Sequence, residues 1–240
     1  MIKTQKYKSG FTLVEMAVVL VIIGLLIGGM LSPLSVQLEQ RNYSETLRAM
    51  DEAREALIAY GMSRGYLPCP AISGQNGAED RDATGLCTLN KRVGFLPWAE
   101  LGLPKLDSWG HLYRYSVTLT YANKNLKISV IPAATQDITI TTRNATGTLI
   151  NLSNLDAIPA VIMSFGKNAG GATNNDGTVV TNTSTTNVDE GSNVSIIGRK
   201  FISRDISENS SITGGEFDDI VMWLSPNVYL NRMVSVGQLP

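Results

Sequence analysis

The sequence predicts an α+β protein in which one long N-terminal α-helix leads into a globular head with a β-sheet. Three features predict this fold class. An apolar run extends from Phe11 to Leu31, an amphipathic pattern with helical spacing continues to Tyr60, and short segments of alternating or β-branched residues follow between turn signals. Because domains typically contain about 100–150 residues, we expect 240 residues to form one domain with an appended element.

The composition excludes several classes of function. Apolar residues make up 43% of the chain, which is enough for a core, and its 20 basic and 21 acidic residues are scattered rather than gathered on an arginine-rich face. We therefore expect no nucleic-acid partner. The common nucleophile, phosphate-loop and zinc-protease motifs are absent from the sequence, and His111, the single histidine, is better placed as a turn residue. The sequence predicts that the protein is not an enzyme and needs no cofactor.

The apolar run has the length of a membrane span. Only Thr12 and Glu15 interrupt its apolar and glycine residues between Phe11 and Leu31. At about 1.5 Å per residue this helix would cover about 30 Å, the hydrocarbon thickness of a bilayer. Three lysines precede the run and no matching cluster follows it, so the positive-inside tendency places residues 1–10 in the cytoplasm.

The junction between this basic leader and the apolar run carries a family resemblance. It reads Ser9-Gly10-Phe11-Thr12-Leu13-Val14-Glu15, after Lys3, Lys6 and Lys8. This arrangement resembles the class III signal peptide and N-terminal helix of type IV pilins and of type II secretion pseudopilins. The resemblance implies cleavage between Gly10 and Phe11 by a prepilin peptidase and N-methylation of Phe11. It also implies a pilin-like fold, in which the long helix packs on an antiparallel β-sheet.

Glu15 is the residue to which the resemblance gives a role in filament assembly. A carboxylate near the centre of a membrane helix costs about 2.5–3.5 kcal/mol and usually marks a function. After cleavage, a natural partner is the new ammonium group of Phe11 on a neighbouring subunit. Such a pair would offset the desolvation of both charges and fix the axial stagger of the subunits. The alternative is a tolerated carboxylate near the membrane interface.

These features divide the chain into four parts. Residues 1–10 form the leader, 11–32 the transmembrane or filament-core helix, 33–61 the amphipathic half of the helix, and 62–240 a periplasmic head. Pro33 lacks a backbone donor, so we expect it to kink or loosen the helix. Gly61 is the expected C-cap.

Two cysteines, Cys69 and Cys87, lie in a turn-rich region between the helix and the sheet. Behind an export signal they predict a disulfide, which in the chain-entropy model contributes about 3 kcal/mol for a loop of this length. Two buried thiols are the alternative. A zinc site would need more ligands than His111 supplies.

The head begins with a second resemblance to major pseudopilins. Residues 107–115, Asp-Ser-Trp-Gly-His-Leu-Tyr-Arg-Tyr, resemble their Asp-x-Trp-Gly-x-x-Tyr-x-Tyr stretch, where a turn enters the first strand. The strand candidates are 113–120, 126–132, 137–142 and 160–165. Residues 166–195 are poor in aliphatic side chains and predict a polar surface loop or short hairpins. Residues 217–225 read as a strand or short helix, and 227–233 as a final helix.

Two polar groups in the head offer oxygen ligands of the kind that Ca²⁺ prefers: Asn174, Asn175 and Asp176, and Glu216, Asp218 and Asp219. Major pseudopilins bind calcium in a late loop, but neither group matches their ligands residue by residue. A solvated loop and an acidic turn are the alternatives, so the sequence assigns no metal ligand.

Taken together, the sequence predicts a structural subunit of a type IV pilus-like filament, a pilin or pseudopilin and more often a minor one. Its partners would be the prepilin peptidase, other subunits, an inner-membrane assembly platform and the membrane itself. The subunit would wait in the inner membrane with its head in the periplasm before joining a periplasmic or surface filament for pilus biogenesis or type II secretion. The alternative is an uncleaved, signal-anchored periplasmic binding protein.

Overall fold

The computed structural model describes residues 10–126, 138–152, 158–195 and 197–238, without the side chains of residues 28–33. The chain forms two compact units, Met1–Asn42 and Tyr43–Pro240. Residues 1–9 of the expected leader, and all but the first residue of the strand expected at 126–132, lie outside the described residues.

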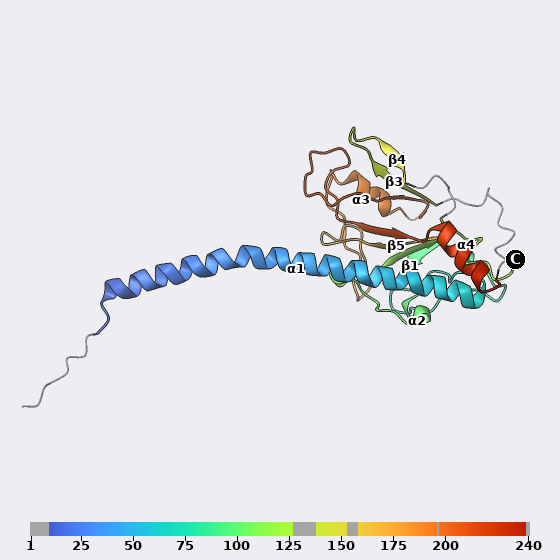
Figure 1. Cartoon of the computed structure of the whole chain (residues 1–240), viewed down its shortest axis with the longest axis horizontal. Coiled ribbons are helices and arrows are strands. Elements are labelled where there is room, and N and C mark those ends of the chain that lie inside the picture. The colour runs from blue at the N-terminus through green and yellow to red at the C-terminus, as the bar shows by residue number, and fades with distance from the viewer. Residues whose placement is uncertain (1–9, 127–137, 153–157, 196, 239–240) are drawn as a thin grey trace, which may run out of the picture. The chain divides into compact units, whose positions relative to one another are not determined.

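The described chain begins with one long helix and continues with short strands and helices (Figure 1). The order is α1 (Leu13–Arg64), η1 (Thr88–Asn90), β1 (Val93–Phe95), α2 (Trp98–Leu101), β2 (Arg114–Val117), β3 (Thr139–Arg143), β4 (Leu149–Asn151), β5 (Ala160–Ser164), α3 (Val188–Asn193), β6 (Lys200–Ile202), β7 (Ile220–Trp223) and α4 (Pro226–Ser235).

Helix α1 is continuous from Leu13 to Arg64, so Pro33 does not end it. At its C-terminal end the prediction that Gly61 caps the helix is wrong. Gly61 lies inside the helix, where the ring of Tyr229 leaves no room for a Cβ. The cap is Gly65, which adopts a left-handed conformation at φ +83° and donates its N–H to the Gly61 carbonyl at 2.7 Å.

The head contains two sheets. The larger has the order β1-β2-β5-β7, and each neighbouring pair is antiparallel. Its register places Tyr115 opposite Ile162, and Ile162 opposite Met222. The smaller has the order β4-β3-β6, in which β3 pairs antiparallel with β4 and parallel with β6.

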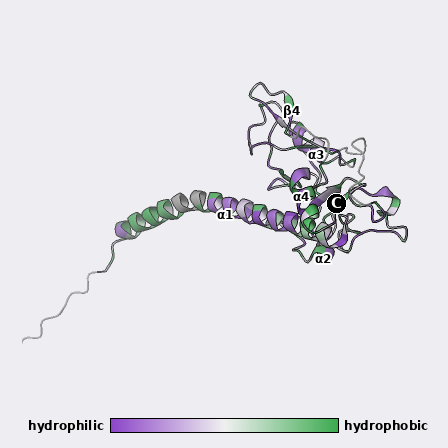
Figure 2. Ribbon diagram, turned by 45° about the vertical axis from the view of Figure 1, so that its right-hand side comes forward, coloured by the Kyte–Doolittle hydropathy of each residue, from purple (hydrophilic) through white to green (hydrophobic). Residues whose placement is uncertain are grey.

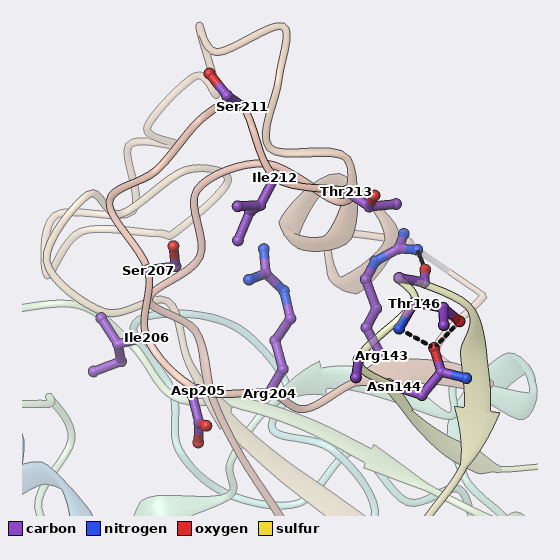
Figure 3. Close-up of a pocket in the computed structure, with 12 residues that line it drawn as sticks. Arg143, Asn144, Thr146, Arg204, Asp205, Ile206, Ser207, Ser211, Ile212 and Thr213 are labelled. Atoms are coloured by element: carbon purple, nitrogen blue, oxygen red, sulfur yellow. Dashed lines mark hydrogen bonds between the residues drawn. The ribbon is translucent and has the colours of Figure 1, made fainter.

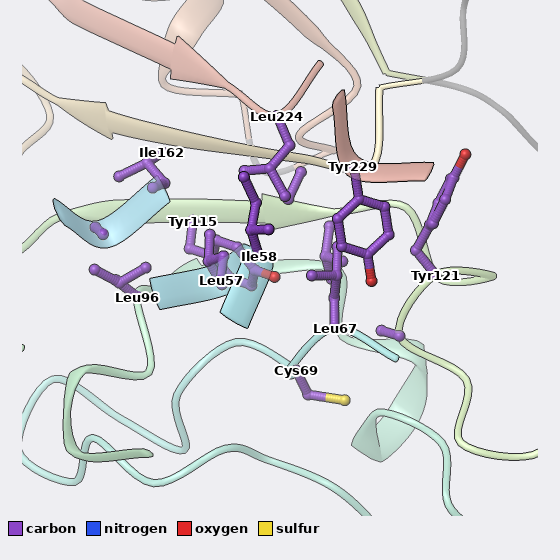
Figure 4. Close-up of a cluster of buried hydrophobic side chains, with 14 of the residues drawn as sticks. Leu57, Ile58, Leu67, Cys69, Leu96, Tyr115, Tyr121, Ile162, Leu224 and Tyr229 are labelled. Carbon is purple, nitrogen blue, oxygen red and sulfur yellow. The ribbon is translucent and has the colours of Figure 1, made fainter. Parts of the chain in front are cut away.

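One hydrophobic core lies between the second half of α1 and the larger sheet (Figure 4). Met50, Ala53 and Leu57 are at most 2% exposed, and their spacing of three and four residues puts them on one face of the helix. This face meets Tyr115 of β2 and Ile162 of β5 in the same cluster. The α+β prediction of a helix packed on an antiparallel sheet is confirmed.

A second core lies on the other face of β5. Ala160 and Ile162 belong to the first cluster, whereas Val161 and Met163 belong to a second cluster with Phe201 of β6. Side chains alternate across a strand, so this division means that β5 is covered on both faces. All five residues of β5 are accordingly buried.

Several expected elements are present. The candidates 113–120 and 160–165 contain β2 and β5, and 137–142 overlaps all of β3 except Arg143, while 217–225 contains β7 and 227–233 lies within α4. Strands β1, β4 and β6 were not predicted. Each is only three residues long, which is too short to show an alternating pattern.

The region between α1 and β1 is organised around a disulfide. Cys69 and Cys87 are joined with a Cα–Cα distance of 5.4 Å, and both are almost fully buried. Arg81 lies within the loop and pairs with Glu79 at 2.9 Å. Its guanidinium also donates to the carbonyl of Ala122 at 2.6 Å. This arginine therefore ties the loop to the chain beyond β2 by hydrogen bonds as well as by the covalent bond.

The polar segment 166–195 is not only the surface loop or hairpins that its composition suggests, because it contains α3. Asp189, Glu190 and Asn193 of this helix are buried. Buried polar groups need hydrogen-bond partners, and these three find them in other parts of the head, as described below.

Candidate functional site

The start of α1 brings together the residues of the predicted cleavage and assembly site. Thr12 precedes the helix, and its N–H and hydroxyl donate to Glu15 Oε2 at 2.7 and 2.8 Å. The Glu15 N–H donates in return to the Thr12 hydroxyl at 3.2 Å. These reciprocal bonds form a capping box, which satisfies backbone donors at a helix start. Glu15 thus has a structural partner within its own chain that the sequence interpretation missed, although Thr-x-x-Glu is the sequence signal of this motif.

Gly10 and Phe11 lie immediately before this capping box. Both residues are exposed, Phe11 by 80% of its surface. A Cβ built on Gly10 would meet no atom within 4 Å among the described residues. The Gly10–Phe11 bond is therefore accessible in a non-helical segment just outside α1, where a peptidase could bind it.

The first part of α1 consists largely of hydrophobic residues (Figure 2), and their side chains are exposed. Leu13, Leu20 and Leu25 are 86%, 65% and 72% exposed. A continuous apolar surface of this kind marks a protein or membrane contact. Within the residues that the structure describes fully, no helix has both the length and the apolar character needed to cross a membrane.

In the head, the stretch around Trp109 forms a turn held by a buried carboxylate. Asp107 Oδ1 accepts hydrogen bonds from the N–H groups of Trp109 and His111 at 3.0 and 2.8 Å, and Oδ2 accepts from the Ser164 hydroxyl at 2.6 Å. The Ser108 N–H donates to the buried hydroxyl of Thr46 at 3.2 Å. This turn joins α1 to β5, and His111 is a residue of the turn, as expected.

The structure brings two of the three acidic calcium candidates together, with a different third residue. Carboxylate oxygens of Glu190, Asp218 and Asp219 lie within 4.8 Å of one another, an arrangement that could hold a cation. Glu216 lies apart from this group and accepts hydrogen bonds from the hydroxyls of Ser184 and Thr186. Glu190 was not predicted as a member of this group because no local sequence pattern marks it. Its position in the group follows from its place in α3.

Burial determines the protonation of this acidic cluster. Desolvation, together with the neighbouring Glu190 carboxylate, raises the pKa of Asp218 to about 7, although hydrogen bonds from the backbone oppose the shift. Burial likewise raises the pKa of Asp219, although a hydrogen bond from Asn193 opposes the shift. The cluster can therefore take up protons near neutral pH.

The other calcium candidate is a compact turn. Asp176 Oδ1 accepts hydrogen bonds from the N–H and hydroxyl of Thr178 at 2.9 and 2.6 Å, and the Asn174 amide donates to the same hydroxyl. The Asn175 carbonyl and side chain accept from Lys105. These oxygens are engaged in hydrogen bonds, and no ligand set converges there among the described acidic residues.

Comparison with known proteins identifies the N-terminal segment. Residues 5–31 match the prokaryotic N-terminal methylation motif. Neither the curated proteins nor the solved structures give a significant match to the chain. The match covers the Gly10–Phe11 junction, the capping box and the exposed apolar part of α1. The protein thus carries the prepilin-type N-terminal motif of type IV pilins and pseudopilins.

Proposed function

We propose that this protein is a structural subunit, a pilin or pseudopilin and a minor one, of a type IV pilus-like filament. The observation that carries this proposal is the order of features at the N-terminus. An accessible Gly10–Phe11 bond is followed at once by a capped helix with an apolar surface and one carboxylate, Glu15. A structural role accounts for this arrangement, because burial of that surface against other helices is itself the function.

In this proposal a prepilin peptidase cuts after Gly10, and the new amino group of Phe11 is methylated. The subunit waits in the inner membrane with its head in the periplasm until an assembly platform extracts it. The helix then exchanges lipid for neighbouring subunits, and the filament serves pilus biogenesis or type II protein secretion. The second resemblance, which is centred on Trp109, favours type II secretion. The polar segment 166–195 suits a subunit with an exposed head.

Cleavage generates the charge that Glu15 would pair with. A carboxylate offers about four hydrogen-bond acceptor sites. Both bonds from Thr12 use Oε2, so Glu15 can keep its capping role while it accepts from the ammonium group of Phe11 in a neighbouring subunit. The capping box would hold the carboxylate in place before the subunits meet, and this preorganisation lowers the entropic cost of pairing.

The proposal is tested by fractionation of cells that produce the native protein. Filaments sheared from the cell surface, or crosslinked in the periplasm, should contain the chain together with other subunits that carry the same motif. A deletion strain should then lose either surface filaments or export of secreted proteins, which separates the pilus from the secretion system. Recovery of the chain only as a membrane-bound monomer, with both processes intact, would favour the signal-anchored binding protein instead.

A further inference from the structure

The head contains a cavity of about 570 Å³ at the edge of the smaller sheet (Figure 3). Its walls come from the β3–β4 turn and from the chain that follows β6. Two arginines, Arg143 and Arg204, contribute to the lining together with hydroxyl and amide side chains, namely Asn144, Thr146, Ser207, Ser211 and Thr213. The volume lies within the range of about 300–1,000 Å³ that is usual for small-molecule sites.

Both arginines bind one fully buried carboxylate. Arg143 donates to Asp189 from Nη2 at 2.6 Å and from Nε at 2.8 Å, and Arg204 donates to Asp189 from Nε at 2.8 Å. Each guanidinium group also donates to a backbone carbonyl. Arg143 Nη1 donates to Gly147, and Arg204 Nη2 donates to Gly215. The two guanidinium groups are therefore fixed in position without a ligand.

The charges in this arrangement do not balance. One carboxylate, Asp189, faces two guanidinium groups and leaves one positive charge beside the cavity. Asp205 also lines the cavity, but Figure 3 shows its carboxylate turned away from the Arg204 guanidinium. The Arg204 side chain is only 9% exposed, and desolvation of this kind strengthens its attraction for an anion.

The fold requires two glycines to bring these groups together. Gly214 and Gly215 adopt left-handed conformations at φ +95° and +76°. A Cβ on Gly214 would collide with the Asp189 carboxylate, and one on Gly215 would collide with the Thr186 carbonyl. The chain can therefore close over the buried carboxylate only with glycine at both positions, directly after Thr213, which lines the cavity.

We propose that this cavity binds a small oxyanion, either the carboxylate of a hydroxylated acidic sugar or a free phosphate. A guanidinium has five N–H donors in a planar fork that suits such groups. Two of the N–H donors of Arg204 bind Asp189 and Gly215, and its guanidinium lies beside Ile212 at the cavity (Figure 3). The surrounding hydroxyl and amide groups would bind the hydroxyls of the ligand.

The test is titration calorimetry on the full-length chain in nonionic detergent at constant ionic strength. Sodium glucuronate and inorganic phosphate are the probes, and glucose is the neutral control. Ile212→Glu supplies the decisive variant, because Ile212 is 40% exposed and points toward Arg204, so a carboxylate there would occupy the site without disturbing the core. Val228→Glu adds the same charge on α4 at a residue that is 50% exposed and does not line the cavity.

We expect wild type and Val228→Glu to bind at least one anion, and Ile212→Glu to bind it at least about tenfold more weakly. Tighter binding of glucuronate than of phosphate identifies the acidic sugar as the ligand class, and the reverse identifies free phosphate. Wild type that binds neither anion, or Ile212→Glu that binds as tightly as wild type, would overturn the proposal. Arg143, Asp189 and Arg204 would then only join β3, α3 and the chain after β6.

Discussion

Thr12 and Glu15 hold each other across the first turn of α1, with Glu15 Oε2 accepting both the Thr12 N–H at 2.7 Å and its hydroxyl at 2.8 Å. The carboxylate proposed to set the position of the subunit in a filament is thus also the residue that completes its helix cap. These two roles differ in what they require. Capping requires a hydrogen-bond acceptor, whereas pairing with an ammonium group requires a negative charge.

Substitutions at these two positions separate the roles. Glu15→Gln keeps an acceptor that capping boxes tolerate but removes the charge, and Thr12→Ala keeps the charge but removes the two bonds of the Thr12 hydroxyl. We expect Glu15→Gln and Glu15→Ala to be processed after Gly10 and to be largely absent from sheared filaments. Thr12→Ala should be incorporated at a moderately reduced level, because a lost cap costs about 1 kcal/mol.

Immunoblots of the processed subunit in membrane and filament fractions measure both steps. If Glu15→Gln assembles as well as wild type while Thr12→Ala does not, then Glu15 acts as a cap and the proposed charge pair is incorrect.

The packing of α1 on the larger sheet predicts a large loss of stability on truncation of Leu57. This side chain is fully buried in the first core, and removal of a buried leucine side chain down to alanine costs about 2–5 kcal/mol. Leu57→Ala should therefore lower the urea midpoint of the head clearly, as followed by tryptophan fluorescence. Leu89→Ala is the matched control, because Leu89 is 94% exposed and its truncation should change stability by less than about 0.5 kcal/mol. Equal midpoints for the two variants would contradict the assigned helix register.

The acidic cluster predicts an unusual pH dependence of stability. The folded-state pKa of Asp218 is raised to about 7 from an ordinary value of 3.8, so the folded head holds a proton between these values that the unfolded chain releases. Its contribution to stability is fully present below pH 3.8 and is lost as the pH rises through about 7. The unfolding free energy should therefore fall between pH 5.5 and 7.5, by up to about 1.4 kcal/mol per pH unit for one proton.

Asp218→Asn should reduce this slope, because its amide is neutral at every pH and can still accept the N–H of Asn168. Some slope should remain, since burial raises the pKa of Asp219 in the same direction. The measurement is urea unfolding at several pH values with EDTA present, which prevents a divalent cation from neutralising the carboxylates. Asp205→Asn serves as the control, because Asp205 is exposed. If the unfolding free energy of Asp218→Asn falls with pH as steeply as that of wild type and of this control, then Asp218 does not take up the proton.

The α+β fold could be predicted because its main signals are local. The stripe of Met50, Ala53 and Leu57 repeats with the period of a helix, and the strand that contains Ile162 is an apolar run between turn residues. The end of α1 was misplaced because two glycines, Gly61 and Gly65, satisfy the same local rule. Gly65 is the cap, and Gly61 serves a different purpose, since the ring of Tyr229 packs where its Cβ would lie.

The polar interior of the head could not be predicted in this way. Asp189 and Glu190 lie in a segment without apolar periodicity, and their burial depends on arginine, asparagine and backbone partners from distant parts of the chain. The capping box is different, because Thr12-x-x-Glu15 is a local motif that the sequence interpretation passed over in favour of the membrane role of Glu15. Local motifs were thus readable at the N-terminal site, and only long-range contacts reveal the groups in the head.

The central claim is that the chain is processed at the Gly10–Phe11 bond and acts as a filament subunit. The most direct test is mass spectrometry of the N-terminus of the protein isolated from its own cells. The proposal predicts a mature chain that begins at Phe11 and carries one methyl group on its amino nitrogen. A protein that retains Met1 and the complete leader would contradict the claim and favour the signal-anchored alternative.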